Sequence, residues 1–524
     1  MRRIATILLG MMCCWVAQAQ QHNQQLEKLN YTYNYLQNNY IEEIDLEPLV
    51  TEAIKATLKQ LDPHTSYLTR QEMSQMLNSI NGEFSGIGAN VAIHNDTLII
   101  TRILPTSPSE AAGLRKNDRI LSVGNTTLVG LERKCAVEHL RGPKGSVASL
   151  VILRGGQEQH VDVIRNDIPT KSVDVAYMLN DSVAYIRVDS FLSRTTTEEF
   201  KEAVKPLGDM QAMIIDLRGN SGGLLTSAIK LSELFLERGD AIVSTEGRKG
   251  TTRYQSSRSG EYRDIPLAIL VDESTASASE VFAGALQDQD RAIIIGRRTF
   301  GKGLIQKLVK FKDDTGARIT IARYKTPSGR IIQRPYRLGE TDEYNANRER
   351  YNHPDSMLLD SLPRYSTLRS NRTVYGGGGI TPDIYIAKDS LAAKPFTRAM
   401  VKSHIVQKVI IELFDRIAID EFIARYPTLS DYTAAFTLDN SSRELMKSLV
   451  ATKDETLLDD CEGIAESIRV IEAQIAEEVY GVGSYYYIYG RERDNTLKRA
   501  IDIISSPSSV ADILDSAEIA EKKI

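Results

Sequence analysis

A serine and a lysine in the middle of the chain have neighbours that suit them to nucleophilic chemistry. Ser277 stands within Ser274–Glu280, and Lys302 lies between two glycines in the apolar segment Thr299–Gln306. A serine hydroxyl needs a base to become a nucleophile, and burial lowers the pKa of a lysine so that it can act as that base near neutral pH. The pair therefore predicts acyl transfer through a covalent serine intermediate.

Both residues also have ordinary structural explanations. Ser277-Ala278-Ser279-Glu280 fits a capping box at a helix start, which alone would favour a capping role for the serine. A lysine most often lies at the surface with its ammonium in water. The distribution of bases favours catalysis, because none of the seven histidines lies between residues 182 and 333, whereas Lys302 does.

A glycine-rich loop, Asp216–Gly223, follows a predicted buried strand and precedes a predicted helix. Its unobstructed backbone N–H groups suit an anion or a developing oxyanion. A phosphate-binding loop is the alternative, but that motif ends in Gly-Lys-Ser or Gly-Lys-Thr, and Gly222-Gly223-Leu224 lacks the lysine. The predicted oxyanion donors are the N–H of Ala278 and an N–H at Gly222 or Gly223.

The elements that must position these loops alternate between strand and helix patterns from residue 182 to residue 295. Alternation of this kind predicts parallel βαβ units. Continuous apolar runs such as Ile293–Ile295 predict strands that are covered on both faces. Both candidate loops follow such strands, where open α/β sheets bind their ligands. We expect an α/β catalytic core over residues 169–390.

Residues 81–168 have a different pattern, with short β-rich runs between glycine and proline turns. A glycine loop, Phe84–Gly88, is followed by the short helix signal Ser107–Leu114 and the strand signal Asp118–Val123. This order resembles a PDZ domain, in which the backbone N–H groups of a glycine loop bind a terminal carboxylate. We expect four residues to bind the C-terminal tail of a peptide: Phe84, Gly86, Ile87 and Gly88.

The remaining segments are predicted to be helical or exposed. Residues 20–80 and 391–524 have apolar positions at helical spacing, whereas residues 334–375 are polar and predict a surface insertion in the core. His64 interrupts the first helical region, and we interpret it as a hydrogen-bonding turn residue in preference to a metal ligand, since no second ligand stands nearby.

Residues 1–19 have the pattern of a secretory signal peptide. Arg2 and Arg3 precede an apolar run, and Ala17-Gln18-Ala19 offers a small-x-small cleavage pattern. A membrane anchor is the alternative, but the run is shorter than the roughly 20 residues that cross a bilayer. We expect an exported protein, periplasmic in a bacterium with two membranes, and no membrane span after cleavage of the signal.

Composition and length narrow the class further. A chain of 524 residues is too long for one hydrophobic core, so several domains are expected. A net charge of −5 argues against a nucleic-acid-binding protein, since binding the phosphate backbone requires an excess of basic residues. Cys135 and Cys461 are far apart, and we expect packed thiols rather than a disulfide. No metal or cofactor is implied.

Taken in order, these motifs resemble the carboxyl-terminal processing peptidases, also called tail-specific proteases. The resemblance extends over roughly residues 61–383. It implies a PDZ domain before a crotonase- or Clp-protease-like α/β core, within a multidomain α/β chain that has helical terminal regions. The segments that carry it are Leu61–His64, Leu140–Gly145, Asp216–Gly223, Ser277–Glu280 and Thr299–Gly303.

The resemblance also assigns roles to individual residues. It implies Ser277 as the nucleophile, Lys302 as the base and Gln306 as the residue that orients the lysine. A direct contact between Lys302 and Gln306 needs a bend, since four extended residues span about 13 Å. The resemblance further implies a supporting carboxylate at Asp288 and a switch at Arg141.

Two other interpretations stay open. The chain could be a catalytically idle PDZ adaptor, or a crotonase-type acyl-thioester enzyme, since such folds also use glycine-loop amides as an oxyanion hole. The presence of both Ser277 and Lys302 favours a protease with a Ser-Lys mechanism, which would act on proteins or peptides with free C-termini. Dimers or higher oligomers through the terminal helices are a further prediction.

Overall fold

The computed structural model describes residues 24–80, 83–94, 96–104, 106–169, 171–347, 361–388, 394–481, 483–490 and 494–505. The predicted signal peptide and residues 348–360 of the predicted insertion lie outside the described residues. Among the helices that are described, none has the length and apolarity that a membrane crossing requires.

A six-stranded sheet forms the centre of the described chain, in the order β10-β11-β12-β15-β16-β21. β10 is antiparallel to β11, and all other neighbours are parallel. The predicted alternation of strands and helices is thus confirmed. The strands are β10 (Val175–Met178), β11 (Val183–Arg187), β12 (Ala212–Asp216), β15 (Leu267–Val271), β16 (Ile293–Gly296) and β21 (Ile384–Tyr385).

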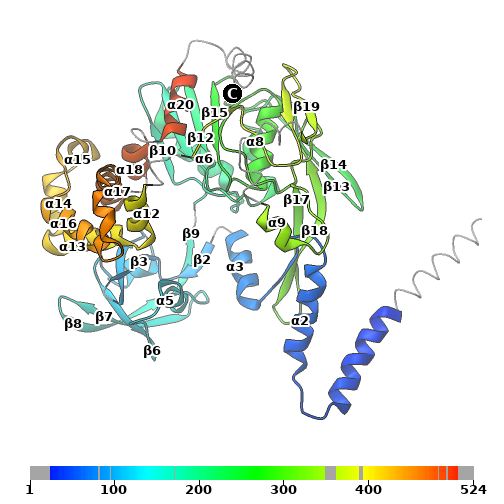
Figure 1. Cartoon of the computed structure of the whole chain (residues 1–524), viewed down its shortest axis with the longest axis horizontal. Coiled ribbons are helices and arrows are strands. Elements are labelled where there is room, and N and C mark those ends of the chain that lie inside the picture. The colour runs from blue at the N-terminus through cyan, green and yellow to red at the C-terminus, as the bar shows by residue number, and fades with distance from the viewer. Residues whose placement is uncertain are drawn as a thin grey trace, which may run out of the picture.

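Helices cover both faces of this sheet (Figure 1). Ile215 of β12 packs on the face of the sheet that α6, α7 and α8 cover, whereas the adjacent Ile214 packs on the face that α20 covers. Successive strand residues point to opposite faces, and both faces are covered. Every residue of β12 and β15 is therefore buried, as the apolar runs predict. The helices are α6 (Thr196–Val204), α7 (Leu225–Ser232), α8 (Ala278–Asp288) and α20 (Asn495–Ile504).

A second, antiparallel sheet lies beside the first and has the order β1-β18-β13-β14, with β17 paired to β18. The register of β17 on β18 shifts between Ile305 and Gln306. Such a bulge re-aims the side chains that follow it. The strands are β1 (Ser66–Leu68), β13 (Ala241–Gly247), β14 (Gly250–Gln255), β17 (Leu304–Lys310) and β18 (Gly316–Lys325).

A β-rich unit built around Leu98, Ile120 and Ile152 precedes the core. Its sheet has the order β3-β4-β5-β7-β8, with β6 beside β5, and β2 pairs with β9 where the unit joins the rest of the chain. The elements are β2 (Glu83–Gly86), β3 (Ala89–His94), β4 (Thr97–Ile103), α4 (Pro108–Ala111), β5 (Arg119–Val123), β6 (Thr126–Thr127), α5 (Arg133–Leu140), β7 (Val147–Arg154), β8 (Gln157–Ile164) and β9 (Asn166–Pro169).

The described chain begins with helices. A helix over residues 24–39 projects away from the rest of the molecule, and α2 (Leu46–Lys59) leads back to the second sheet (Figure 1). α3 (Arg70–Ile80) then connects β1 to the β-rich unit. The N-terminal region is therefore helical, as its periodicity predicts.

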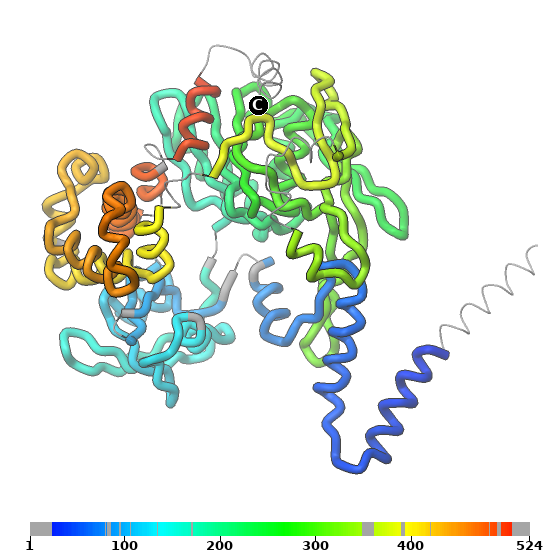
Figure 2. The backbone as a smooth tube through the Cα atoms, in the orientation of Figure 1, coloured from blue at the N-terminus to red at the C-terminus, as the bar shows by residue number. Residues whose placement is uncertain are grey.

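A helical bundle with its own apolar core follows the core sheets. It lies beside the β-rich unit (Figure 2), where Ile411 packs on Ala92 and Ile99 and Lys116 forms an ion pair with Glu478 at 3.0 Å. The elements are α12 (Pro395–Lys402), α13 (Ile405–Arg416), α14 (Ile419–Arg425), α15 (Leu429–Ala435), α16 (Asn440–Ala451) and α17 (Cys461–Tyr480); α18 (Gly483–Tyr485) and η4 (Tyr486–Gly490) lead on to α20.

Two details differ from the sequence expectations. Cys135 and Cys461 are exposed free thiols, so the prediction that they are packed is wrong; both lie on helix positions that face solvent. The predicted surface insertion contains α9 (Thr341–Ala346) and the hairpin of β19 (Arg364–Ser366) and β20 (Thr373–Tyr375), and it buries side chains such as Arg334 and Tyr344.

The C-terminal end of α8 is fixed by a fully buried ion pair. Asp288 lies 2.6 Å from Nη2 of Arg330, and its other oxygen accepts hydrogen bonds from the N–H and hydroxyl of Ser328. Removing one partner of such a pair leaves the other charge buried and uncompensated.

We therefore predict that Asp288→Ala destabilises the protein by about 3–5 kcal/mol. The measurement is urea unfolding followed by far-UV circular dichroism, with Asp209→Ala at an exposed position as the control. An unfolding midpoint for Asp288→Ala equal to that of the control would contradict the structural role.

Candidate active site

Ser277 occupies a strained turn between β15 and α8. Its φ is +58°, a left-handed conformation that costs an L-residue roughly 1–3 kcal/mol and persists only where the surroundings impose it. Its N–H donates to Glu280 at 2.8 Å, and its carbonyl accepts from the Tyr324 hydroxyl at 3.1 Å. The backbone on both sides of the serine is therefore held in place.

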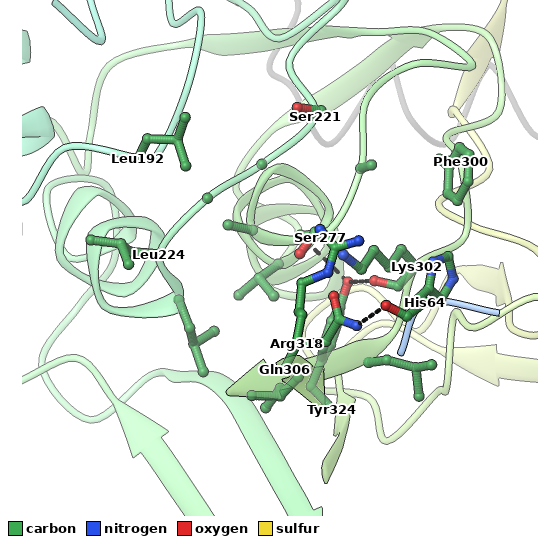
Figure 3. A pocket seen from close by; sticks show the side chains of 18 of the residues that line it. His64, Leu192, Ser221, Leu224, Ser277, Phe300, Lys302, Gln306, Arg318 and Tyr324 are labelled. Carbon is green, nitrogen blue, oxygen red and sulfur yellow. Dashed lines mark hydrogen bonds between the residues drawn. The ribbon is translucent and has the colours of Figure 1, made fainter. Parts of the chain in front are cut away.

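Six residues predicted from the sequence line one pocket of about 680 Å³. In Figure 3 the side chains of Lys302 and Arg318 extend toward Ser277, from the loop before β17 and from β18. Helix α3 contributes Met76 and Ile80 to the apolar part of the lining. The predicted residues that the pocket brings together are Ser277, Lys302, Gln306, Gly222, Gly223 and Ala278.

Lys302 has the electrostatic environment of a base. Burial, together with the positive charge of Arg318, lowers its pKa to about 8. The carboxylates of Glu280 and Asp62 act in the opposite direction. Near pH 8 the amine therefore has a substantial neutral fraction that can accept a proton.

Gln306 is aimed into the pocket by the β17 bulge. Its Nε2 donates to the backbone carbonyl of His64 at 2.6 Å (Figure 3). This bond fixes the amide with its nitrogen on the His64 side. The bulge between Ile305 and Gln306 interrupts the extended segment that joins Lys302 to Gln306.

The glycine-rich loop lies in contact with the serine turn. A Cβ on Gly222 would come within 2.5 Å of the Ala276 carbonyl and 2.8 Å of the Ala278 nitrogen, so only glycine allows this approach. The Gly222 N–H already donates to Asn220 Oδ1 at 2.9 Å. Gly223, with φ +152°, packs as closely against Phe191.

Glu280 is the residue whose importance sequence reasoning missed. Its buried carboxylate accepts four hydrogen bonds, two at each oxygen, from both the serine turn and the lysine loop. Burial raises its pKa, and these hydrogen bonds oppose the rise. The capping box indicates only the bond from Ser277. The donors are the Thr299 hydroxyl at 2.6 Å and the N–H groups of Gly301 at 2.7 Å, Ser277 at 2.8 Å and Lys302 at 2.9 Å.

His64 is a turn residue, as predicted, because its N–H donates to Asp62 at 3.0 Å. It also lines the pocket, which the sequence did not indicate. Burial, together with the positive charge of Lys302, lowers the pKa of its imidazole to about 4. Within the described residues, no group of His, Cys, Asp or Glu side chains could hold a metal ion.

The other predicted residues lie away from this pocket. Asp288 is at the far end of α8 with Arg330. In the β-rich unit, Gly86 ends β2, Ile87 is buried in the core, and Gly88 has φ +75°. A Cβ on Gly88 would meet Ser107 at 2.4 Å. Phe84 pairs through its backbone with Ile168, and Arg141 is exposed after α5.

Comparison with known families matches three segments of the chain. Residues 182–339 match peptidase family S41, residues 77–153 match the PDZ domain, and residues 15–72 match the N-terminal domain of the activating protease CtpB. The segments follow one another in the order expected from the sequence.

Individual relatives point the same way. A probable CtpA-like serine protease of Staphylococcus aureus is 36% identical over 312 residues, 59% of this chain and 62% of the relative. One from Staphylococcus epidermidis is 33% identical over 333 residues, 63% of this chain and 67% of the relative. The chain thus spans just under two thirds of the first relative's length.

Among solved structures, the photosystem II D1 C-terminal processing protease is similar at 24% identity. It has a TM-score of 0.38, with 69% of this chain and 87% of that chain covered. The family resemblance and the multidomain α/β fold expected from the motifs are confirmed by the family matches and the curated relatives. The chain belongs to peptidase family S41, among the CtpA-like carboxyl-terminal processing peptidases.

Proposed function

We propose that this chain is an exported serine endopeptidase that binds the C-terminal tails of proteins through its PDZ domain and cleaves peptide bonds by a Ser-Lys mechanism. The observation that carries the proposal is the convergence of Ser277, Lys302 and the glycine-rich loop on one pocket, with the pKa of Lys302 lowered to about 8. Family membership supports the same chemistry.

In the acylation step, neutral Lys302 takes the proton from the Ser277 hydroxyl as Oγ attacks the peptide carbonyl carbon. The carbonyl oxygen becomes an oxyanion in a tetrahedral intermediate. When this collapses, the carbon–nitrogen bond breaks and protonated Lys302 gives its proton to the leaving amine. The N-terminal part of the substrate is now an ester of Ser277, and Lys302 is neutral again.

In deacylation, water attacks the ester carbonyl while Lys302 takes one of its protons. Collapse of the second tetrahedral intermediate returns the proton to Ser277 Oγ and releases a carboxylic acid. Gln306 would orient the lysine through its amide oxygen, since its nitrogen is engaged with His64. A neutral amide suits this role because it adds no negative charge to raise the pKa of the lysine.

The oxyanion would receive hydrogen bonds from the Ala278 and Gly223 N–H groups. Gly223 is favoured over Gly222 because the Gly222 N–H donates to Asn220, whereas the described residues offer no acceptor for that of Gly223. Gly222 serves by its lack of a side chain, which lets the loop approach the serine turn. A helix start adds a favourable dipole at Ala278.

The substrate class follows from the lining of the pocket. Aliphatic side chains surround the serine, so an apolar residue at the cleaved bond would lose water favourably on binding. They are Met76, Ile80, Leu224, Val281, Ile305 and Leu308. In the PDZ domain, the backbone at Phe84, Gly86, Ile87 and Gly88 would receive the terminal carboxylate, and Arg141 remains the proposed switch.

Assembly and location are part of the proposal. The helix over residues 24–39 exposes Leu26, Leu29, Tyr31 and Tyr35, which favours dimerisation through terminal helices. Export to the periplasm would follow from the signal pattern of residues 1–19. The adaptor alternative does not account for a lysine of lowered pKa in the same pocket as a strained serine.

We predict that Ser277→Ala and Lys302→Ala each lower cleavage of an unfolded reporter with a free apolar C-terminus by at least about 10³-fold. Lys307→Ala, at an exposed position on β17, is the matched control. Amidation of the reporter's C-terminus should weaken cleavage by raising KM, as measured from steady-state kinetics. Full activity of Ser277→Ala would contradict the mechanism, and inactivity of the wild type on this reporter would favour the adaptor.

A second prediction concerns pH. Because Lys302 must be neutral, kcat/KM should rise about ten-fold per pH unit and level off above about pH 8, where its pKa lies. Arg318→Gln removes a positive charge that lowers this pKa, so the midpoint should move to higher pH. Lys307→Gln is the control, and an unmoved midpoint in Arg318→Gln would refute the assignment of Lys302 as the titrating base.

A further inference from the structure

Helix α20 comes from the end of the described chain, yet it is part of the catalytic core. Leu497, Ala500, Ile503 and Ile504 are buried against the face of the sheet that carries Ile214 and Leu270. This packing holds the helix start in one place. Asp494 caps the helix, accepting hydrogen bonds from the N–H groups of residues 496 and 497 at 3.0 Å.

The carboxylate of Asp494 also reaches the glycine-rich loop. Its Oδ2 lies 2.5 Å from Nη1 of Arg218, and both side chains are only 17% exposed. Arg218 belongs to the loop itself and stands four residues before Gly222. The far C-terminal helix therefore contacts the segment that would supply an oxyanion donor.

Arg218 is the centre of a compact charge network. Its Nη2 lies 2.6 Å from Asp216, whose carboxylate is fully buried at the end of β12 and also accepts from the Tyr185 hydroxyl at 2.7 Å. Burial opposes ionisation of Asp216, but the charges of Arg218 and Arg187 outweigh it, so its pKa lies below the ordinary value. Nη2 of Arg187 donates to the Arg218 carbonyl at 3.0 Å.

The arginines share Asp216, and each has one further carboxylate. Arg187 has Asp189 at 2.6 Å, and Arg218 has Asp494 at 2.5 Å. Without Asp494, Nη1 of the largely buried Arg218 guanidinium would lose its acceptor. Turning toward water would then lower the free energy of the arginine. Because its backbone continues into Gly219–Gly223, such a movement would displace the loop.

We infer that Asp494 is a positioning residue for the proposed cleavage reaction, holding the glycine-rich loop against Ser277 through its ion pair with Arg218. The inference rests on the proposed function, since it assigns the carboxylate to the step in which the oxyanion forms. Asp494 does not touch the reacting atoms. It acts through Arg218 on the placement of the Gly223 N–H.

Asp494→Asn tests this cleanly, because Asn caps helices about as well as Asp and the change removes only the charge. Asp502→Asn is the matched control, since Asp502 is exposed on the same helix. Asp494→Glu restores a carboxylate. Arg218→Lys breaks the bridge from the other side, because an ammonium cannot span two carboxylates as a guanidinium does.

We expect kcat of Asp494→Asn to fall about ten-fold, a part of the 10²–10³ that loss of an entire oxyanion donor costs, with KM changed less than two-fold. Arg218→Lys should behave alike, Asp494→Glu should recover most of the loss, and Asp502→Asn should match the wild type. Amide hydrogen exchange by mass spectrometry should show faster exchange over residues 216–224 in Asp494→Asn, with residues 495–504 unchanged.

Unaltered kcat and unaltered exchange over residues 216–224 in Asp494→Asn would overturn the inference, as would an effect confined to KM. Faster exchange over residues 495–504 would mean that the helix itself is lost, and Arg218→Lys with wild-type kcat would then overturn it. A wild-type protein without peptidase activity would refute the proposed function instead, while the exchange measurement would still decide whether Asp494 holds the loop.

Discussion

The carboxylate of Glu280 joins the two loops on which the site depends. One oxygen accepts from Ser277 and Lys302 and the other from Thr299 and Gly301, so a single buried group joins the turn of Ser277 to the loop of Lys302. Burying a carboxylate is costly unless hydrogen bonds compensate it, and here four do so. The Tyr324 hydroxyl adds a second link, because it lies within hydrogen-bond distance of the carbonyls of Ser277 and Lys302. The strained φ at Ser277 is maintained by these contacts.

Other parts of the chain complete the site from outside this centre. The turn at His64 orients Gln306, α3 adds apolar lining, and α20 reaches the glycine-rich loop through Asp494. The bundle that precedes α20 also contacts the β-rich unit through Ile411 and the ion pair of Lys116 with Glu478. Segments separated by hundreds of residues thus hold a pocket whose reactive groups lie close together in sequence. The core is built on an α/β sheet, and its glycine-rich loop is joined to α20 by the ion pair of Arg218 with Asp494.

Local motifs in the sequence predicted much of the core sheet and of the pocket. The apolar runs predicted the parallel sheet. The glycine, serine and lysine segments predicted the residues that meet in the pocket, because each segment follows a strand of that sheet. The capping box marked Glu280 but not its bonds to Thr299, Gly301 and Lys302, which depend on how β16 and the next loop return to α8. Asp494 has no local pattern beyond a helix cap, and the exposure of Cys135 and Cys461 depends on which helix face meets solvent. These are tertiary properties, which periodicity does not encode.

The central claim is that the substrate becomes esterified to Ser277. The most direct measurement is rapid acid quench of the full-length protein with the p-nitrophenyl ester of an apolar peptide, followed by intact-mass and peptide-level mass spectrometry. An activated ester makes acylation faster than hydrolysis, so the intermediate accumulates. The account predicts a mass increase equal to the acyl group, located on the peptide that contains Ser277, in step with the release of p-nitrophenol. Turnover with no adduct, or with the adduct on another residue, would contradict it.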